Sequence, residues 1–211
     1  MFPSSNTRFA RSLALSWDRQ PYVTPGSPMS GVGMDWRLIS GNMFIANYQS
    51  QEAIDNDDGS AYYNTTGNFL VYGENGLKSD FGGHDNRHSN NVYAYITGSC
   101  MGDGSNQLED HEDWFMGNRC VLMDGGDYGG FPVDGGWPLM GGNEVYVRNA
   151  EAVDSLGLNG ETMAEFQSKY PGVDDGSKAY SLDGVSEQDI VDWGRKLLMK
   201  APLPSGATNT M

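Results

Sequence analysis

The stretch "GNFLVYG", residues 67–73, decides the fold, because its short apolar strand follows a glycine-asparagine pair and the same pattern recurs along the chain. It recurs as "GNMFIANY" from residue 41, "NNVYAYI" from 90, "GNRCVLM" from 117 and "GNEVYVR" from 142. The asparagines Asn42, Asn68, Asn91, Asn118 and Asn143 are separated by 26, 23, 27 and 25 residues. A near-constant step of this size indicates a solenoid, in which each turn of chain stacks on the previous one.

The length of the repeat predicts an all-β fold, a parallel β-helix. An asparagine that points inward at a repeated corner can hydrogen-bond the backbone of the next coil, which satisfies groups that burial would leave unpaired. The alternative is an antiparallel sandwich with turns at short intervals. We favour the β-helix because the strands are too far apart for hairpins and no Asn-Gly two-residue turn links neighbouring ones.

Composition excludes several classes of partner. The 13 Lys and Arg residues against 28 Asp and Glu residues give a net charge of -15, which repels phosphate backbones and anionic membrane surfaces. We therefore expect no nucleic-acid and no membrane partner. No run of about 18 apolar residues is present, and the apolar "SLAL" near the N-terminus is too short for a signal peptide.

After residue 150 the repeated asparagine-strand pattern ends and helical patterns begin. We expect β-helix coils over 1–150, a short α-helical C-terminal cap over 151–200 and a disordered tail over 201–211. Thr162 and Glu165 form a capping-box pattern, and Ser186 is the N-cap of a second predicted helix. These helices are too short to form their own core, so we expect both to cover the open end of the solenoid.

The two cysteines, Cys100 and Cys120, are too few for a disulfide framework and lack the spacing of metal ligands. Two alternatives stay open from the sequence. Either they form one bridge, or both are buried free thiols.

In a solenoid, residues one repeat apart in the sequence lie on adjacent coils, about 4.8 Å from each other along the axis. The local step of 23 carries Asp57 onto Asp80, so we expect these carboxylates on neighbouring coils. The next step, of 27, places "HDN", residues 84–86, on "HED", residues 111–113. The aligned pairs are His84 with His111, Asp85 with Glu112, and Asn86 with Asp113.

Paired carboxylates favour glycoside hydrolysis. Two carboxyl groups about 5 to 5.5 Å apart suit a retaining glycosidase, and a gap of about 6.5 to 9.5 Å suits an inverting one. A turn is the simpler interpretation of "DNDDGS", residues 55–60, since Asx side chains bond local backbone. A calcium loop of the EF-hand type is excluded because Ile54 stands where the first Asp belongs, although other oxygen-rich Ca²⁺ sites stay open.

Three segments carry a resemblance to a known family. They are "SWDRQPY" (16–22), "QEAIDNDDGSAYYNTTGNFLVYGENGLKSDFGGHDNRHSNNVYAY" (51–95) and "HEDWF" (111–115). Together they resemble the right-handed parallel β-helix proteins of algal and marine type, which are similar to β-helix glycoside hydrolases and polysaccharide lyases. The resemblance spans roughly residues 16–200 and implies a right-handed, pectin lyase-like fold. Relatives carry a further polar coil where this chain reads "TRFARSLAL", so we expect an N-terminally incomplete solenoid.

The resemblance implies a carbohydrate-active protein, and a glycoside hydrolase is the interpretation we favour. The segment at 57–59 matches the one that supplies an acidic catalytic residue in related glycosidases, and Asp80 lies where the second carboxylate falls. The expected catalytic residues are Asp57, Asp58 and Asp80. The expected substrate-binding residues are Trp17, Asp18, Arg19, Lys78, His84, Asp85, His111 and Glu112.

Two alternatives stay open. The first is a polysaccharide lyase, with Lys78 or His84 as the base and Ca²⁺ neutralising a uronate. The second is a solenoid that binds glycans without catalysis, as an adhesion module does. In each case we expect a polysaccharide or oligosaccharide partner, a monomer, no metal or other cofactor except Ca²⁺ in the lyase, and, by the resemblance, an extracellular or secretory location.

Overall fold

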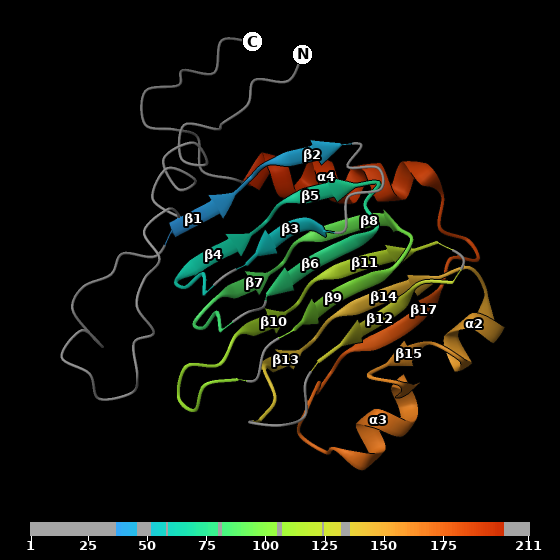
Figure 1. Cartoon of the computed structure of the whole chain (residues 1–211). Coiled ribbons are helices and arrows are strands. Elements are labelled where there is room, and N and C mark those ends of the chain that lie inside the picture. Colours follow the sequence, from blue (N-terminus) through green and yellow to red (C-terminus); the bar gives the residue numbers. More distant parts are fainter. Residues whose placement is uncertain are drawn as a thin grey trace, which may run out of the picture.

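The computed structural model describes residues 37–45, 52–57, 59–79, 82–104, 107–123, 125–131 and 136–200. Over these residues the chain forms a parallel β-solenoid of about four turns, as the sequence predicts. Three parallel sheets form the sides of the solenoid (Figure 1). In each coil the chain passes from the first sheet to the second and then to the third.

Each sheet takes one strand from successive coils. The first sheet contains β1 (Arg37–Ser40), β4 (Tyr63–Thr66), β7 (Arg87–Ser89), β10 (Trp114–Met116) and β13 (Leu139–Gly141). The second contains β2 (Met43–Ile45), β5 (Phe69–Val71), β8 (Val92–Ile96), β11 (Arg119–Leu122), β14 (Glu144–Val147) and β17 (Lys178–Ser181). The third contains β3 (Glu52–Asn56), β6 (Asn75–Ser79), β9 (Ser99–Asp103), β12 (Asp127–Gly130), β15 (Gly157–Leu158) and β16 (Glu161–Thr162). Pairing is parallel throughout these strands except between β15 and β16.

The five repeated asparagines form a continuous ladder between the first and second sheets. In each of the four steps the side-chain Nδ2 donates to Oδ1 of the next asparagine, at 3.0 to 3.3 Å. The backbone N–H of the same residue donates to that oxygen as well, at 2.8 to 3.1 Å. All five side chains are buried. The ladder therefore pairs amide groups that the solenoid interior would otherwise leave unsatisfied.

The residue before each ladder asparagine has a positive φ, between 54° and 66°. These residues are Gly41, Gly67, Asn90, Gly117 and Gly142. A left-handed backbone conformation costs glycine nothing and asparagine little, whereas most side chains strain it. The glycine-asparagine pair in the sequence thus encodes a sharp corner followed by an inward amide.

Serine replaces asparagine at the last rung. The backbone N–H of Asn143 donates to Ser177 Oγ at 2.9 Å, and Asn143 Nδ2 donates to the Tyr128 hydroxyl at 2.8 Å. Ser177 Oγ and the Tyr128 hydroxyl both donate to Asp174 Oδ1. A different set of polar groups therefore ends the ladder near the C-terminal cap.

The interior between the sheets is apolar and contains a disulfide. Cys100 on β9 is bonded to Cys120 on β11, and both residues are fully buried. The bridge links the third sheet to the second across the core, so of the two alternatives for the cysteines the structure shows the bridge. Tyr93, Met101 and Phe115 pack in the same core.

The C-terminal segment contains α2 (Ala150–Asp154), α3 (Met163–Lys169) and α4 (Glu187–Lys200), together with strands β15, β16 and β17. Thr162 and Glu165 form the predicted capping box of α3. Ser186 and Asp189 bond each other in the same reciprocal way at the start of α4. Both predicted helix starts are confirmed.

The positions of the two helices differ. Phe166 of α3 packs into the core beside β15, as expected for a cap. The sequence also predicts α4 at the end of the stack, and this is wrong. Helix α4 lies instead along the second sheet, beside β5 and β8 (Figure 1). Its Ile190 packs with Phe69 and Val92 in a cluster separate from the core between the sheets. The apolar side chains of that cluster explain the placement, since they require cover from water.

We expect Asn118→Ala to destabilise the protein by about 2 to 4 kcal/mol, because it leaves the Asn91 N–H without its acceptor and the His88 carbonyl without its donor. Urea unfolding followed by circular dichroism measures the loss. The control is Asn64→Ala at a half-buried position of β4, expected within about 0.5 kcal/mol of the wild type. Equal effects of the two substitutions would contradict the structural role of the ladder.

Candidate functional site

Polar residues gather where the chain leaves the third sheet and enters the first. Strands β3, β6 and β9 end at residues 56, 79 and 103, and β4, β7 and β10 begin at 63, 87 and 114. We call the described residues of 57–62, 82–86 and 107–113 the loop corner. Each of these loops lies beside its equivalent in the next coil, so the corner collects side chains from three coils.

Two imidazoles meet on one carboxylate oxygen at the loop corner. His84 Nδ1 lies 2.9 Å and His111 Nδ1 lies 2.6 Å from Asp85 Oδ2. The two imidazole rings are 5.6 Å apart between centroids. The side chain of His84 is 5% exposed, that of Asp85 22% and that of His111 17%. The cluster is therefore mostly buried but accessible to solvent through Asp85 and His111. The predicted proximity of His84 and His111 is therefore present.

Hydrogen bonding favours the charged form of the Asp85 carboxyl. Burial raises the pKa of the Asp85 carboxyl, but the hydrogen bonds and charges of His84 and His111 outweigh it and hold the pKa below its usual value. Asp85 is consequently a carboxylate that accepts from both Nδ1–H groups. Burial, together with the Asp85 charge and hydrogen bond, raises the pKa of the Tyr62 phenol. The Tyr62 ring also meets the His84 ring edge to face, at 5.4 Å between centroids.

Glu112 does not join this cluster. Its Oε1 accepts from the Asp110 N–H at 3.2 Å, within its own loop. The 27-residue repeat aligns Asp85 with Glu112, but the Asp85 carboxylate contacts the imidazoles whereas Glu112 does not.

A buried hydrogen-bonded path connects the loop corner with the third sheet. Asp113 Oδ1 accepts from the Asn86 N–H at 2.6 Å, which is the predicted pairing of those residues. The Asp113 N–H donates to Gln107 Oε1 at 2.8 Å, and Gln107 Nε2 donates to Asp103 Oδ2. Burial raises the pKa of the Asp113 carboxyl to about 6. At 1% exposure Asp113 can order the corner but cannot reach a substrate.

His88, on β7, lies in the interior and contacts polar residues of the third sheet instead of the loop corner. Its Nε2 is 3.3 Å from Asn56 Nδ2 and 3.2 Å from Ser79 Oγ. The ring is fully buried, and burial lowers the pKa of the imidazole to about 3. His88 is therefore neutral and structural.

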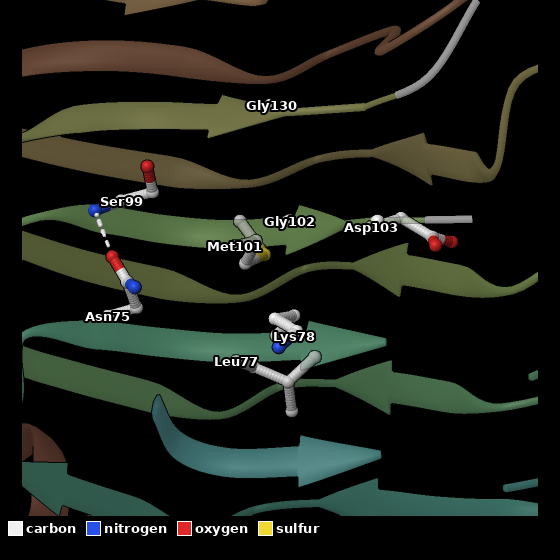
Figure 2. A pocket seen from close by; sticks show the side chains of 9 residues that line it. Asn75, Leu77, Lys78, Ser99, Met101, Gly102, Asp103 and Gly130 are labelled. Atoms are coloured by element: carbon white, nitrogen blue, oxygen red, sulfur yellow. Dashed lines mark hydrogen bonds between the residues drawn. The ribbon is translucent and has the colours of Figure 1, made fainter. Parts of the chain in front are cut away.

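An open pocket of about 230 Å³ lies over β6, β9 and β12 of the third sheet. Figure 2 shows Asn75 and Ser99 toward one end of this third-sheet pocket and Asp103 toward the other. The side chains of Leu77 and Met101 are 1% and 0% exposed and belong to the core, so these two residues line the pocket with backbone. The polar lining comes from Asn75, Lys78, Ser99 and Asp103. Gly102 and Gly130 face each other in register on neighbouring strands, and their lack of side chains leaves the hollow.

Lys78 is the sequence-predicted residue that lines this pocket. Its Nζ lies 3.6 Å from Glu52 Oε1 and 3.9 Å from Asp55 Oδ2, on the neighbouring strand β3. These contacts are long for ion pairs and about a quarter of the lysine side chain is exposed, so they orient the ammonium group more than they stabilise the fold.

Asp57 lies at the start of the loop corner, where its carbonyl accepts from the Ser60 N–H at 3.1 Å and from Ser60 Oγ at 2.6 Å. This geometry agrees with the turn interpretation of residues 55–60.

The strand register supports the predicted step of 23 residues between coils. Asn56 pairs with Ser79, and these two residues come immediately before Asp57 and Asp80 in the sequence. The predicted site residues that lie outside the described part of the chain are Asp58, Asp80, Trp17, Asp18 and Arg19.

Sequence reasoning missed Gly102, Asp103 and Gln107. A signal for the first two was available, because aligning "LKS" of 77–79 with "MGD" of 101–103 at a step of 24 places a glycine beside Lys78. Gln107 sits in a loop without a repeat partner, so no periodic signal points to it.

No family model, curated protein or solved structure matches this chain. Among the described residues, no helix is long and apolar enough to cross a membrane.

The buried His88 predicts a specific pH dependence. Its pKa is lowered from 6.5 to about 3 in the folded state, so between those values the unfolded chain binds a proton that the native protein does not. The stability that the neutral ring contributes is present above pH 6.5 and is lost as pH falls toward 3. We expect the stability difference between the wild type and His88→Gln to shrink by about 3 kcal/mol from pH 7 to pH 4. Urea unfolding at both pH values measures it, and a constant difference would refute a neutral buried ring.

Proposed function

We propose that this β-solenoid is a carbohydrate-active protein that binds a neutral oligosaccharide or polysaccharide segment in the third-sheet pocket. The shape and polar lining of the pocket carry the proposal, because the side chains of Asn75, Lys78 and Ser99 line a hollow that Gly102 and Gly130 leave open. A sugar ring presents hydroxyl groups at its edge, which these polar side chains can hydrogen-bond, and C–H groups on its faces, which can lie against the bare backbone of Gly102 and Gly130. Specificity then comes from a small number of placed polar groups.

The arrangement of the pocket suits a linear chain. Three consecutive strands line it, so a ligand that lies across the strands meets a similar surface about every 4.8 Å. Its volume of about 230 Å³ is below the roughly 300 Å³ at which pockets for drug-sized ligands begin. A pocket of this size fits one unit of a longer polymer whose remaining units lie along the open sheet surface.

Charge favours a neutral ligand over a polyuronate. The net charge of -15 repels anionic polymers, and Lys78 in the pocket is already flanked by Glu52 and Asp55. The disulfide between Cys100 and Cys120 supports the further proposal of an extracellular or secretory location, since such bridges persist mainly in oxidising compartments.

Filling the pocket should weaken binding. A side chain at Gly130 would meet no atom within 4 Å at its Cβ, so Gly130→Ile is expected to fold and to project into the hollow. In gel electrophoresis through immobilised neutral polysaccharides (a β-glucan, a galactan and a xylan), we expect retardation of the wild type by at least one. For the variant we expect about tenfold weaker binding. The control Leu139→Ile places the same side chain on an exposed position of the first sheet and should behave as the wild type. Equal retardation of all three proteins would contradict the pocket as the site.

Hydrolysis by Asp57 and Asp80 is the second candidate function. The observation that favours it is the pairing of Asn56 with Ser79, which extends the 23-residue step to the end of β3 and β6. If the step continues by one residue, Asp57 and Asp80 lie on neighbouring coils, where one serves as general acid and the other as nucleophile or base.

Elimination by Lys78 has less support. Glu52 and Asp55 stabilise the positive charge of its ammonium group, and a protonated amine cannot accept the proton that a lyase removes.

If the protein hydrolyses the polysaccharide it binds, Asp57→Asn and Asp80→Asn should each lower the release of reducing ends by at least about 100-fold, because each removes an acid-base or nucleophilic group. Retention on the same polysaccharide should be unchanged. Asp154→Asn, in α2, serves as the charge-matched control. Undiminished release from both variants would exclude these carboxylates, and new ultraviolet-absorbing ends would indicate elimination instead.

A further inference from the structure

We propose that His84, Asp85 and His111 form a binding site for a divalent first-row transition metal ion. The site is distinct from the third-sheet pocket and goes beyond the proposed function. One nitrogen of each imidazole and a carboxylate oxygen of Asp85 all lie within 4.8 Å of one another. The nitrogens that contact the Asp85 carboxylate are His84 Nδ1 and His111 Nδ1. Two imidazoles and one carboxylate on one face of an ion leave further coordination positions open.

The geometry requires little movement to accept an ion. Metal–nitrogen and metal–oxygen bonds of about 2.0 to 2.2 Å with angles between octahedral and tetrahedral place neighbouring ligand atoms about 2.8 to 3.6 Å apart. The Nδ1 atoms of His84 and His111 are already 2.9 and 2.6 Å from Asp85 Oδ2. A shift of a few tenths of an ångström along these two contacts, with closer approach of the imidazoles, therefore accommodates the ion.

The stacked coils hold the three residues in place before any ion binds. His84 forms a parallel bridge with Ala61, and the Asp85 N–H donates to the His111 carbonyl at 3.0 Å. Asp85 itself has φ 54°, a left-handed conformation that fixes the direction of its side chain. Because the backbone is fixed on both coils, binding has little loop entropy to overcome.

The donor set selects the class of ion. Imidazole nitrogen suits Zn²⁺, Co²⁺, Ni²⁺ and similar ions, whereas Ca²⁺ and Mg²⁺ prefer oxygen ligands. The net charge of -15 on the chain favours a cation over an anion at this site. Binding places each imidazole in the tautomer with the proton on Nε2, so that the Nδ1 lone pair faces the ion.

The experiment uses the full chain without a polyhistidine tag, stripped with a chelator and titrated with Zn²⁺. The chain has three histidines, so each imidazole can be followed by nitrogen-detected nuclear magnetic resonance. We expect the Nδ1 resonances of His84 and His111 to shift to the values of metal-bound nitrogen, while those of the buried His88 stay unchanged. Isothermal titration calorimetry gives the stoichiometry, which should be one ion per chain.

Two ligand variants and one matched control complete the test. Asp85→Asn keeps the shape of the side chain and tolerates the positive φ, and His111→Gln changes the more exposed imidazole. Each should weaken Zn²⁺ binding at least about tenfold. Glu109→Gln removes one charge from an exposed position of the same loop and should bind as the wild type. Unshifted His84 and His111 resonances, or wild-type affinity in both ligand variants with a native circular dichroism spectrum, would overturn the proposal.

Discussion

The buried amide ladder is the interaction on which the rest of the structure depends. Each rung uses one side-chain oxygen to accept two N–H groups of the previous asparagine, so the register between coils is fixed at a single position in every turn. A slip of one residue would move the asparagine oxygen away from these donors at every rung and leave buried polar groups unpaired. The constraint applies at the corner between the first two sheets, and the remaining part of each coil is free to vary in length.

The loop corner uses that freedom. Coils of unequal length accommodate loops of different size there, yet the strands on either side stay in register. Side chains from separate coils are therefore brought together by a rigid frame, as in the contact of His84 and His111 with Asp85. Buried groups such as Asp113 and Gln107 support the exposed ones without facing solvent. This division of roles is typical of functional loops on rigid scaffolds.

The sequence predicts those features that follow the repeat. The ladder, the parallel coils, the proximity of His84 to His111 and the pairing of Asn86 with Asp113 all follow from the spacing of the asparagines. The position of α4 does not, because an amphipathic helix fits any apolar surface and the outward-facing Phe69 is indistinguishable in sequence from an inward one. The third-sheet pocket was also missed, since it arises from absent side chains at Gly102 and Gly130.

Ser177 at the final rung has a consequence for how such a chain can change in length. Its hydroxyl accepts the Asn143 N–H but is committed to Asp174, so it passes no amide on to another coil. Duplication of a whole unit between two ladder asparagines would preserve every junction, whereas addition after residue 177 would find no matching partner. The bonding pattern of the ladder therefore tolerates insertion of whole coils before residue 177 and does not extend beyond it.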